Sequence, residues 1–192
     1  MVADSSSLAK VFEGWEGYQA SLVRSVAPLT AKQLAWRQSD RVRTLGEFAW
    51  HIAFARIDWF KFMGAPGSAE AINRITRWET DDDGNQWIAQ DTESIVEDAG
   101  ELVHWLDVSW LIIEKTLGIW SVSDLGVTYG HTWNGETYMN SRQWAIWRIM
   151  ANDIHHGGQI ARILAEQDIE AFELRGLGGH IVIPLLAIAK GS

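Results

Sequence analysis

Apolar residues recur at helical spacing along four long stretches of this 192-residue chain, and only three prolines interrupt the sequence. The second stretch has the clearest start, because Thr44 and Glu47 form a capping box ahead of it. Gly64 stands among the stop signals at its end. The pattern predicts an all-α fold, an antiparallel four-helix bundle with one crossover connection. The expected long helices are 5–25, 44–63, 92–117 and 141–167.

The last stretch is predicted to begin at Asn140, an N-cap candidate with Gln143 three residues further on. On a helical wheel, Asn152 and His156 are four residues apart and stack on the boundary between the polar and apolar faces. Asp153 falls inside the apolar face. Because an unpaired buried charge is very costly, this carboxylate needs a partner elsewhere in the fold.

Two interpretations of His156 stay open. It is either a core histidine that hydrogen-bonds a backbone group, or one of two metal ligands together with Asn152. In the second case, a third ligand comes from another helix. The neighbouring His155 lies in the polar arc of the wheel, turned away from the core.

The second stretch is apolar on nearly every side, which is typical of a buried helix. Its polar exceptions are therefore informative. Glu47, His51 and Asp58 form one stripe along it. A histidine aligned with two carboxylates in an aromatic helix indicates a metal ligand or an acid–base group, with a buried structural histidine as the alternative.

The segments between the long helices carry weaker signals. Short helices are expected at 30–38 and 69–78. The acidic loop 80–85 lacks the alternating ligands and the final glutamate of a calcium-binding EF-hand loop. Alternating residues around an Asn-Gly pair predict a small hairpin or loop within 122–138.

The remaining histidines receive no definite role. His131 lies in the expected hairpin, from where it could reach the mouth of a pocket. His104 lies off the core stripe of its helix, which favours a position at the surface. His180 follows a glycine-rich segment near the end of the chain.

The composition narrows the class of protein. The formal net charge is −9 with no basic patch, so a nucleic-acid partner is not expected. The chain has no cysteine, which excludes disulfides, thiolate metal sites and a cysteine nucleophile in the protein itself. Twelve tryptophans are spread along the sequence and indicate core and pocket lining.

The apolar tail 181–189 is too short to cross a membrane, because a spanning helix needs about 20 residues. The polar N-terminus lacks the apolar core of a signal peptide. We therefore expect one domain over 1–192, no membrane contact and a cytoplasmic location. The tail is expected to pack on this domain or on a second copy, and a homodimer is favoured.

Three parts of the chain carry a family resemblance. The segments TLGEFAWHIAFAR at 44–56 and WAIWRIMANDIHHGGQIARIL at 144–164 occur together with a connector from Leu29 to Arg37. In order and spacing they resemble the DinB-like, or YfiT-like, family of metal-dependent enzymes. This resemblance implies an up-down-down-up four-helix bundle, here with a short loop or hairpin insertion before the last long helix.

The resemblance also implies a divalent metal, zinc or nickel, held by one histidine of the second helix and a histidine pair of the last. On this chain the corresponding positions are His51, Asn152 and His156. An asparagine thus stands where the first histidine of the pair is expected, and its oxygen suits harder ions better than zinc. Gly157 replaces the arginine that usually follows the pair.

The activity implied by the resemblance is metal-dependent chemistry on a small-molecule substrate. It is either hydrolysis or S-transfer with a low-molecular-weight thiol as cosubstrate. The catalytic candidates are the carboxylates Glu47, Asp58 and Asp153. The alternative is a domain that has lost the metal and serves as a small-molecule-binding or dimerisation module, and Asn152 is its main support.

Overall fold

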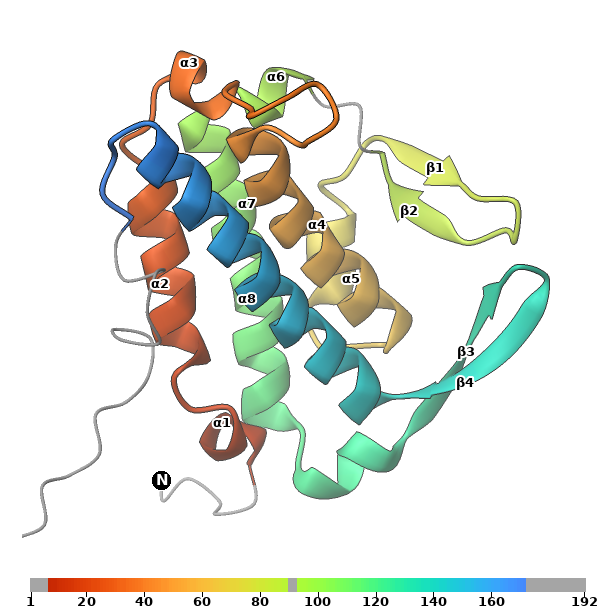
Figure 1. Ribbon diagram of the computed structural model, residues 1–192. Coiled ribbons are helices and arrows are strands. Elements are labelled where there is room, and N and C mark those ends of the chain that lie inside the picture. The colour runs from red at the N-terminus through yellow and green to blue at the C-terminus, as the bar shows by residue number, and fades with distance from the viewer. Residues whose placement is uncertain (1–6, 90–92, 172–192) are drawn as a thin grey trace, which may run out of the picture.

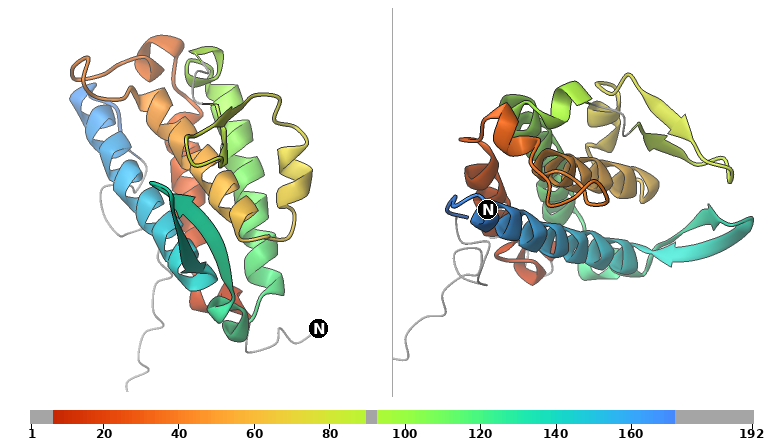
Figure 2. Two further views of the ribbon diagram at one scale, coloured as in Figure 1. Left: turned by 90° about the vertical axis from the view of Figure 1, so that its right-hand side faces the viewer. Right: turned by 45° about the horizontal axis from the view of Figure 1, so that its top comes forward.

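Four long helices dominate the computed structural model, which describes residues 7–89 and 93–171 (Figure 1). They lie side by side, and two small hairpins project from one side of them (Figures 1 and 2). The bounds of the long helices are α2 Trp15–Val26, α4 Leu45–Phe62, α7 Ala99–Ile119 and α8 Arg142–Glu166. The predicted helical character of the chain is confirmed.

Helix α4 lies at the centre of the packing, in contact with both α7 and α8, while α2 packs on α7. The composition of α4 accounts for this position. Its buried side chains include Ile52, Phe54 and Phe60, and they cover nearly all of its circumference. Because a helix of this kind must be covered on all sides, α7, α8 and several shorter elements pack against it.

Short helices and two sheets connect the long helices. The short helical elements are α1 Leu8–Val11, α3 Ala31–Leu34, α5 Ser68–Ile72, α6 Glu93–Val96 and the 3-10 turn η1 Val122–Gly126. The strands of the two antiparallel hairpins are β1 Trp78–Thr80 with β2 Gln86–Ile88, and β3 Thr128–Trp133 with β4 Glu136–Ser141. The second hairpin turns at Asn134 and Gly135, as the Asn-Gly pair predicted.

Two of the expected long helices are interrupted, so their predicted boundaries were wrong. The helix expected over 5–25 divides into α1 and α2, because Gly14 adopts a left-handed φ of 101°. Glycine takes this conformation without steric cost, and an α-helix cannot continue through it. The helix expected over 92–117 divides into α6 and α7, since the Asp98 side chain accepts hydrogen bonds from amides of the next turn.

The last long helix begins one residue later than its capping pattern predicted. Ser141 is the N-cap, and its Oγ accepts a hydrogen bond from the Trp144 amide at 3.1 Å. Asn140 instead belongs to β4, where it pairs with Tyr129. Strand β4 continues through Ser141, which pairs with Thr128, so the helix can begin only after this residue and the cap falls on Ser141.

The segment between α4 and α7 also departs from expectation. The short helix expected at 69–78 ends at Ile72, and the acidic loop 80–85 is the turn of the first hairpin.

The apolar tail 181–189 and His180 lie outside the described residues. Within 7–89 and 93–171, no helix combines the length and the apolar content needed to cross a membrane.

A buried ion pair joins α4 to α8. The Arg56 guanidinium donates to both carboxylate oxygens of Asp153 at 2.8 to 3.1 Å, and both side chains are fully buried. Trp15 of α2 donates its indole N–H to the same carboxylate at 2.8 Å. Gln19, also of α2, accepts from the guanidinium at 2.6 Å. Asp153 thus has the partner that its place on the apolar face requires.

Gly157 marks a close approach between α8 and α2. A Cβ atom at this position would lie 1.8 Å from the hydroxyl oxygen of Tyr18. That hydroxyl donates a hydrogen bond to the Asp153 carbonyl oxygen at 3.0 Å, so it is held in place. The arginine of the resembling family would not fit beside Tyr18, which explains the glycine at this position.

Asp153→Ala should lower the free energy of unfolding by about 3–5 kcal/mol, because it leaves Arg56 as an uncompensated buried charge. Chemical denaturation measures the change. The control is Glu166→Ala, which breaks a more exposed ion pair with Arg162 on the same helix and should cost about 0.5 kcal/mol or less. Equal losses in the two variants would contradict this account of the core.

Gly157→Ala should lower the free energy of unfolding by about 1–3 kcal/mol, since its Cβ overlaps the Tyr18 hydroxyl. Gly158→Ala is the matched control, because a Cβ there meets no atom within 4 Å. Alanine in a helix interior stabilises by about 0.5–1 kcal/mol relative to glycine, so the control should gain stability. A gain in both variants, measured by thermal or chemical denaturation, would rule out the close approach.

Candidate functional site

The histidines of the two predicted site helices meet between α4 and α8. The ring centroids of His51 and His156 lie 4.7 Å apart, and the ring planes are almost perpendicular, at 89°. Phe54 lies against His51 at 5.0 Å between ring centroids, and Phe48 lies against His156 at 5.4 Å. The helical patterns therefore placed both imidazoles correctly, on facing sides of neighbouring helices.

His156 is oriented by a neighbour on its own helix. Its Nδ1 is 2.5 Å from the side-chain oxygen of Gln159, which accepts the ring proton and leaves Nε2 with its lone pair. Burial lowers the pKa of His156, so the neutral ring is favoured. A second residue that fixes the tautomer is typical of metal-binding histidines. Gln159 was not predicted to have this role, although its spacing of three residues was a usable signal.

His51 is the more strongly perturbed of the two imidazoles. Burial lowers the pKa of His51 to about 3, with further lowering by the positive charge of Arg43 and by His156, while a hydrogen bond with Asn152 opposes the shift. At neutral pH the ring is therefore uncharged. Within the described part of the chain, neither His51 Nδ1 nor Asn152 Nδ2 has a hydrogen-bond partner, although both atoms are buried.

A hollow of about 470 Å³ opens beside this pair of helices, and His51 and Asn152 both line it. His155 lines it too, although the wheel turned that residue away from the core. The polar face of α8, which carries His155, forms the rim of the hollow. The ring centroid of His155 lies 4.9 Å from that of His156. The remaining lining residues are Ala55, Trp59, Trp144, Trp147, Arg148, Ile149 and Ala151.

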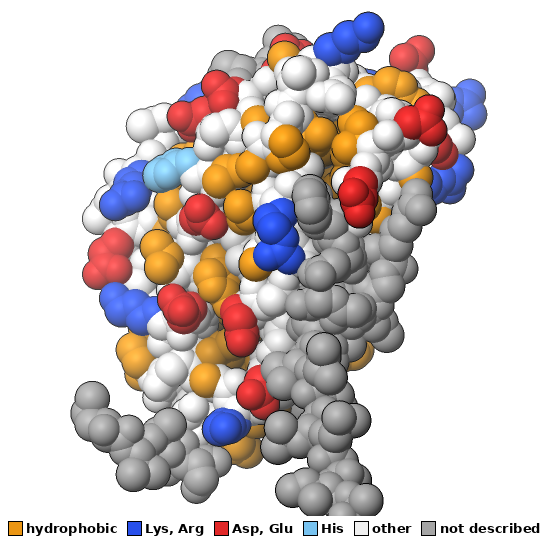
Figure 3. Space-filling model, turned by 90° about the vertical axis from the view of Figure 1, so that its left-hand side faces the viewer, with side chains coloured by type: hydrophobic (Ala, Val, Ile, Leu, Met, Phe, Trp, Pro, Cys, Tyr) orange, Lys and Arg blue, Asp and Glu red, His pale blue; other side chains and the backbone are white. Residues whose placement is uncertain are grey.

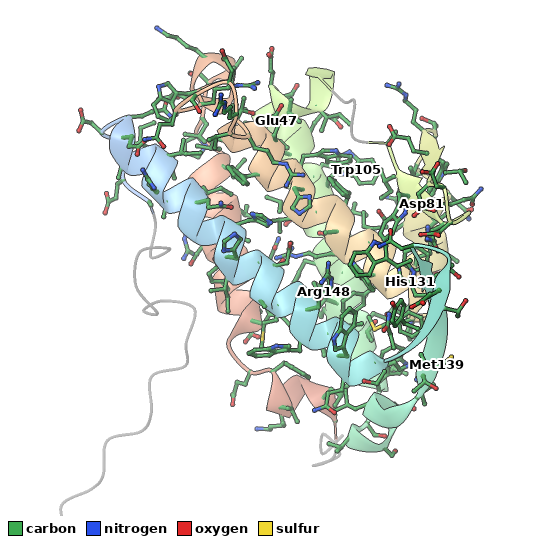
Figure 4. The ribbon with its side chains drawn as sticks, turned by 45° about the vertical axis from the view of Figure 1, so that its right-hand side comes forward. Glu47, Asp81, Trp105, His131, Met139 and Arg148 are labelled. Atoms are coloured by element: carbon green, nitrogen blue, oxygen red, sulfur yellow. The ribbon has the colours of Figure 1, made fainter. Side chains whose placement is uncertain are left out.

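The three candidate carboxylates are held elsewhere. Glu47 accepts the Thr44 amide proton at 2.6 Å in the predicted capping box, near the first turn of α4 (Figure 4). Asp58 accepts the Ile88 amide proton at 3.3 Å and lies 3.6 Å from the Lys61 ammonium. Asp153 is enclosed with Arg56 as described above. None of these carboxylates lines the hollow.

The available metal donors are therefore the imidazoles of His51, His155 and His156 and the amide of Asn152. Among the residues of known placement, no group of three or more His, Cys, Asp or Glu side chains is arranged to hold a metal ion. His51 contacts the ring of His156 and is hydrogen-bonded to Asn152, and imidazole nitrogens with an amide oxygen suit a divalent ion. The unpartnered buried Nδ1 of His51 fits such a ligand role, because a buried polar atom is costly without a partner.

Two residues near the site could not be assigned from the sequence. Arg43 precedes α4 and has no periodic pattern that would place it, yet its charge acts on both imidazoles. His131 of β3 lies in a cluster of aromatic rings beside α4, whereas His104 is exposed and packs on Trp105 at 5.5 Å between ring centroids.

Replacing Asp58 by asparagine should change how stability depends on pH. Burial raises the pKa of Asp58 to about 6, so the native protein keeps a proton that the unfolded chain releases near pH 4. The native state therefore loses stability as pH rises from about 4 to 6. Asp58→Asn removes this loss. The difference in unfolding free energy, variant minus wild type, should therefore be roughly 2 kcal/mol more favourable to the variant at pH 7 than at pH 4. Denaturation at several pH values tests this, and parallel profiles would contradict it.

Comparisons with known proteins agree with the family indicated by the motifs. Residues 15–160 match the model of the DinB superfamily. The fold is similar to the crystal structure of a DinB-like protein from Bacillus cereus ATCC 10987, with a TM-score of 0.62, 15% identity, and coverage of 88% of this chain and 97% of that one. A search of curated proteins finds no match. Since the family model covers most of the chain, including α4 and the histidines of α8, the protein belongs to the DinB superfamily.

Proposed function

We propose that this protein is a divalent-metal-dependent enzyme that acts on a small molecule, with His51, Asn152 and His156 as the metal ligands. The observation that supports this proposal is the meeting of two neutral imidazoles from α4 and α8 beside an open hollow. Histidine binds metal in its neutral form. Three protein ligands are also the usual number at catalytic zinc sites, which keep a further position open.

A bound divalent metal would supply a nucleophile at neutral pH by lowering the pKa of water or of an external thiol. The chain has no cysteine, so S-transfer requires a low-molecular-weight thiol as cosubstrate, and hydrolysis is the other reaction of the proposal. Gln159 holds the tautomer of His156. Arg43 supplies positive charge near both imidazoles, where it can stabilise an anionic substrate or developing negative charge.

The same proposal includes the topology, the cellular location and the oligomeric state of the enzyme. We assign it the up-down-down-up bundle topology of the resembling family, a cytoplasmic location and a homodimeric state. Nucleic acid is not a proposed partner, because the net charge is −9 and basic side chains are interspersed with acidic ones on the face in Figure 3. Several large apolar side chains are exposed away from the hollow, among them Leu111, Ile119 and Met139, and a dimer interface would cover such groups.

A second candidate function is a small-molecule-binding or dimerisation module without metal. One specific observation favours it, namely that Asn152 stands where the resembling family has a histidine. An amide oxygen is a weaker ligand for zinc than an imidazole. The hollow would then bind its ligand through the tryptophans and Arg148 without any metal chemistry.

Metal titration separates the two candidates. Calorimetry with zinc, nickel and manganese on untagged protein should detect a single site, and His51→Ala should abolish it. Asn152→His should raise the zinc affinity by about tenfold or more, because imidazole replaces a weak oxygen ligand. His104→Ala is the control, since that exposed histidine packs on Trp105 outside the site. Absence of any metal binding would favour the metal-free module. Unchanged zinc affinity in Asn152→His would instead show that position 152 is not a ligand position.

A further inference from the structure

A second cavity, of about 570 Å³, lies between α4, α8 and the two hairpins. Its size falls within the range of small-molecule binding sites, about 300–1,000 Å³. Its lining is dominated by aromatic rings and contains one cationic side chain. The lining residues are Trp59, Trp87, His131, Trp133, Tyr138, Asn140, Trp144 and Arg148.

The rings around this cavity form a continuous cluster. His131 is at its centre, with ring centroids 5.3 Å from Trp59, 5.0 Å from Phe62 and 5.6 Å from Trp87. Trp144 of α8 lies 5.5 Å from Trp59. Such walls offer both faces and edges of rings, which suit a flat aromatic ligand. The side chains of Trp144 and Trp133 remain 43% and 64% exposed, so apolar surface is left for a ligand to cover.

Arg148 gives the cavity its charge. Its guanidinium lies over the rings of Trp59 and Trp144, at 4.9 and 5.4 Å from their centroids. Figure 4 shows Arg148 on α8, near the hairpin that carries His131. No carboxylate pairs with Arg148 among the side chains that the structure describes. In a protein with a net charge of −9, an exposed guanidinium that borders an aromatic cavity and has no carboxylate partner within 7–89 and 93–171 favours recognition of an anion.

The hairpins hold one wall of the cavity in position. Asp83, in the turn of the first hairpin, accepts the amide protons of Asn134 and Gly135 in the turn of the second, both at 2.6 Å. Asp81 accepts the indole proton of Trp87 at 2.7 Å. We call the bonds of Asp83 to Asn134 and Gly135 the hairpin contact. Two of the three carboxylates of the acidic loop, Asp81 and Asp83, thus have structural partners, and neither lines the cavity.

We propose that this cavity binds a planar aromatic or heteroaromatic small molecule that carries a carboxylate. The ring packs among Trp59, Trp87 and Trp144, and the carboxylate pairs with the guanidinium of Arg148. An aromatic cation is disfavoured, because Arg148 already occupies the ring faces that would attract it. His131 can add a polar contact, since its buried Nδ1 has no hydrogen-bond partner in the described ranges.

The cavity adjoins the hollow beside His51, because Trp59, Trp144 and Arg148 line both. A ligand held here would extend toward the histidine pair. This makes aromatic carboxylates the substrate class of the enzyme, an extension that rests on the proposed function. Binding of the aromatic carboxylate does not require a metal, so this binding can be tested in chelator-treated protein. If the protein binds no metal, the proposal for this cavity still stands.

Calorimetry with three matched indoles tests the binding. Indole-3-acetate should bind the full-length, chelator-treated protein saturably, and more tightly than the neutral indole-3-acetamide, while the cation tryptamine should bind most weakly. Arg148→Gln should weaken indole-3-acetate binding by about tenfold or more and bring it to the level of the amide. Arg162→Gln, on the same helix but paired with Glu166, is the control and should bind as wild type does.

A second variant tests the aromatic walls. Trp144→Ala should weaken binding of the acid and the amide by similar factors, since it removes packing surface and no charge. Circular dichroism confirms that each variant is folded. The proposal is overturned if indole-3-acetate does not bind, if acid and amide bind equally well to wild type, or if Arg148→Gln leaves the preference for the acid unchanged.

Discussion

The buried ion pair between Arg56 and Asp153 is the interaction on which the rest of the structure depends. It joins the middle of α4 to the middle of α8, the two helices that also carry His51 and His156. Fully buried charges are stable only when their partner stays close, so the pair allows little sliding between the helices. The distance between the two imidazoles is therefore set by electrostatics in the core, about one turn away from the site itself.

Local sequence patterns predicted which residues face the interior of the protein. This was enough to place the two histidines of the candidate site. His51 had to point inward because its helix is apolar all round, and His156 because it lies on the inner side of its own helix. The same reasoning showed that Asp153 needs a partner but could not name it. Arg56 lies 97 residues away, and periodicity relates only neighbours on one helix. As a charge inside a helix that is apolar on nearly every side, Arg56 itself was the unused signal.

The remaining differences arise where short-range preferences compete. Asn140 and Ser141 are both good helix caps, and the second hairpin decided between them because its pairing extends through Ser141 and Thr128. Glu47 and Asp58 share a stripe with His51, yet each carboxylate satisfies a nearby backbone amide instead. A helical wheel identifies side chains that share a face, whereas it cannot identify the groups that another segment brings to that face.

The hairpin contact has a consequence for the motions of this region. A two-stranded hairpin is marginally stable on its own, and here Asp83 of one hairpin bonds the turn of the other, 51 residues away. Neither hairpin can open fully without releasing its neighbour. The two therefore constitute one cooperative opening unit, in which the amide protons of both exchange with solvent in the same local unfolding event.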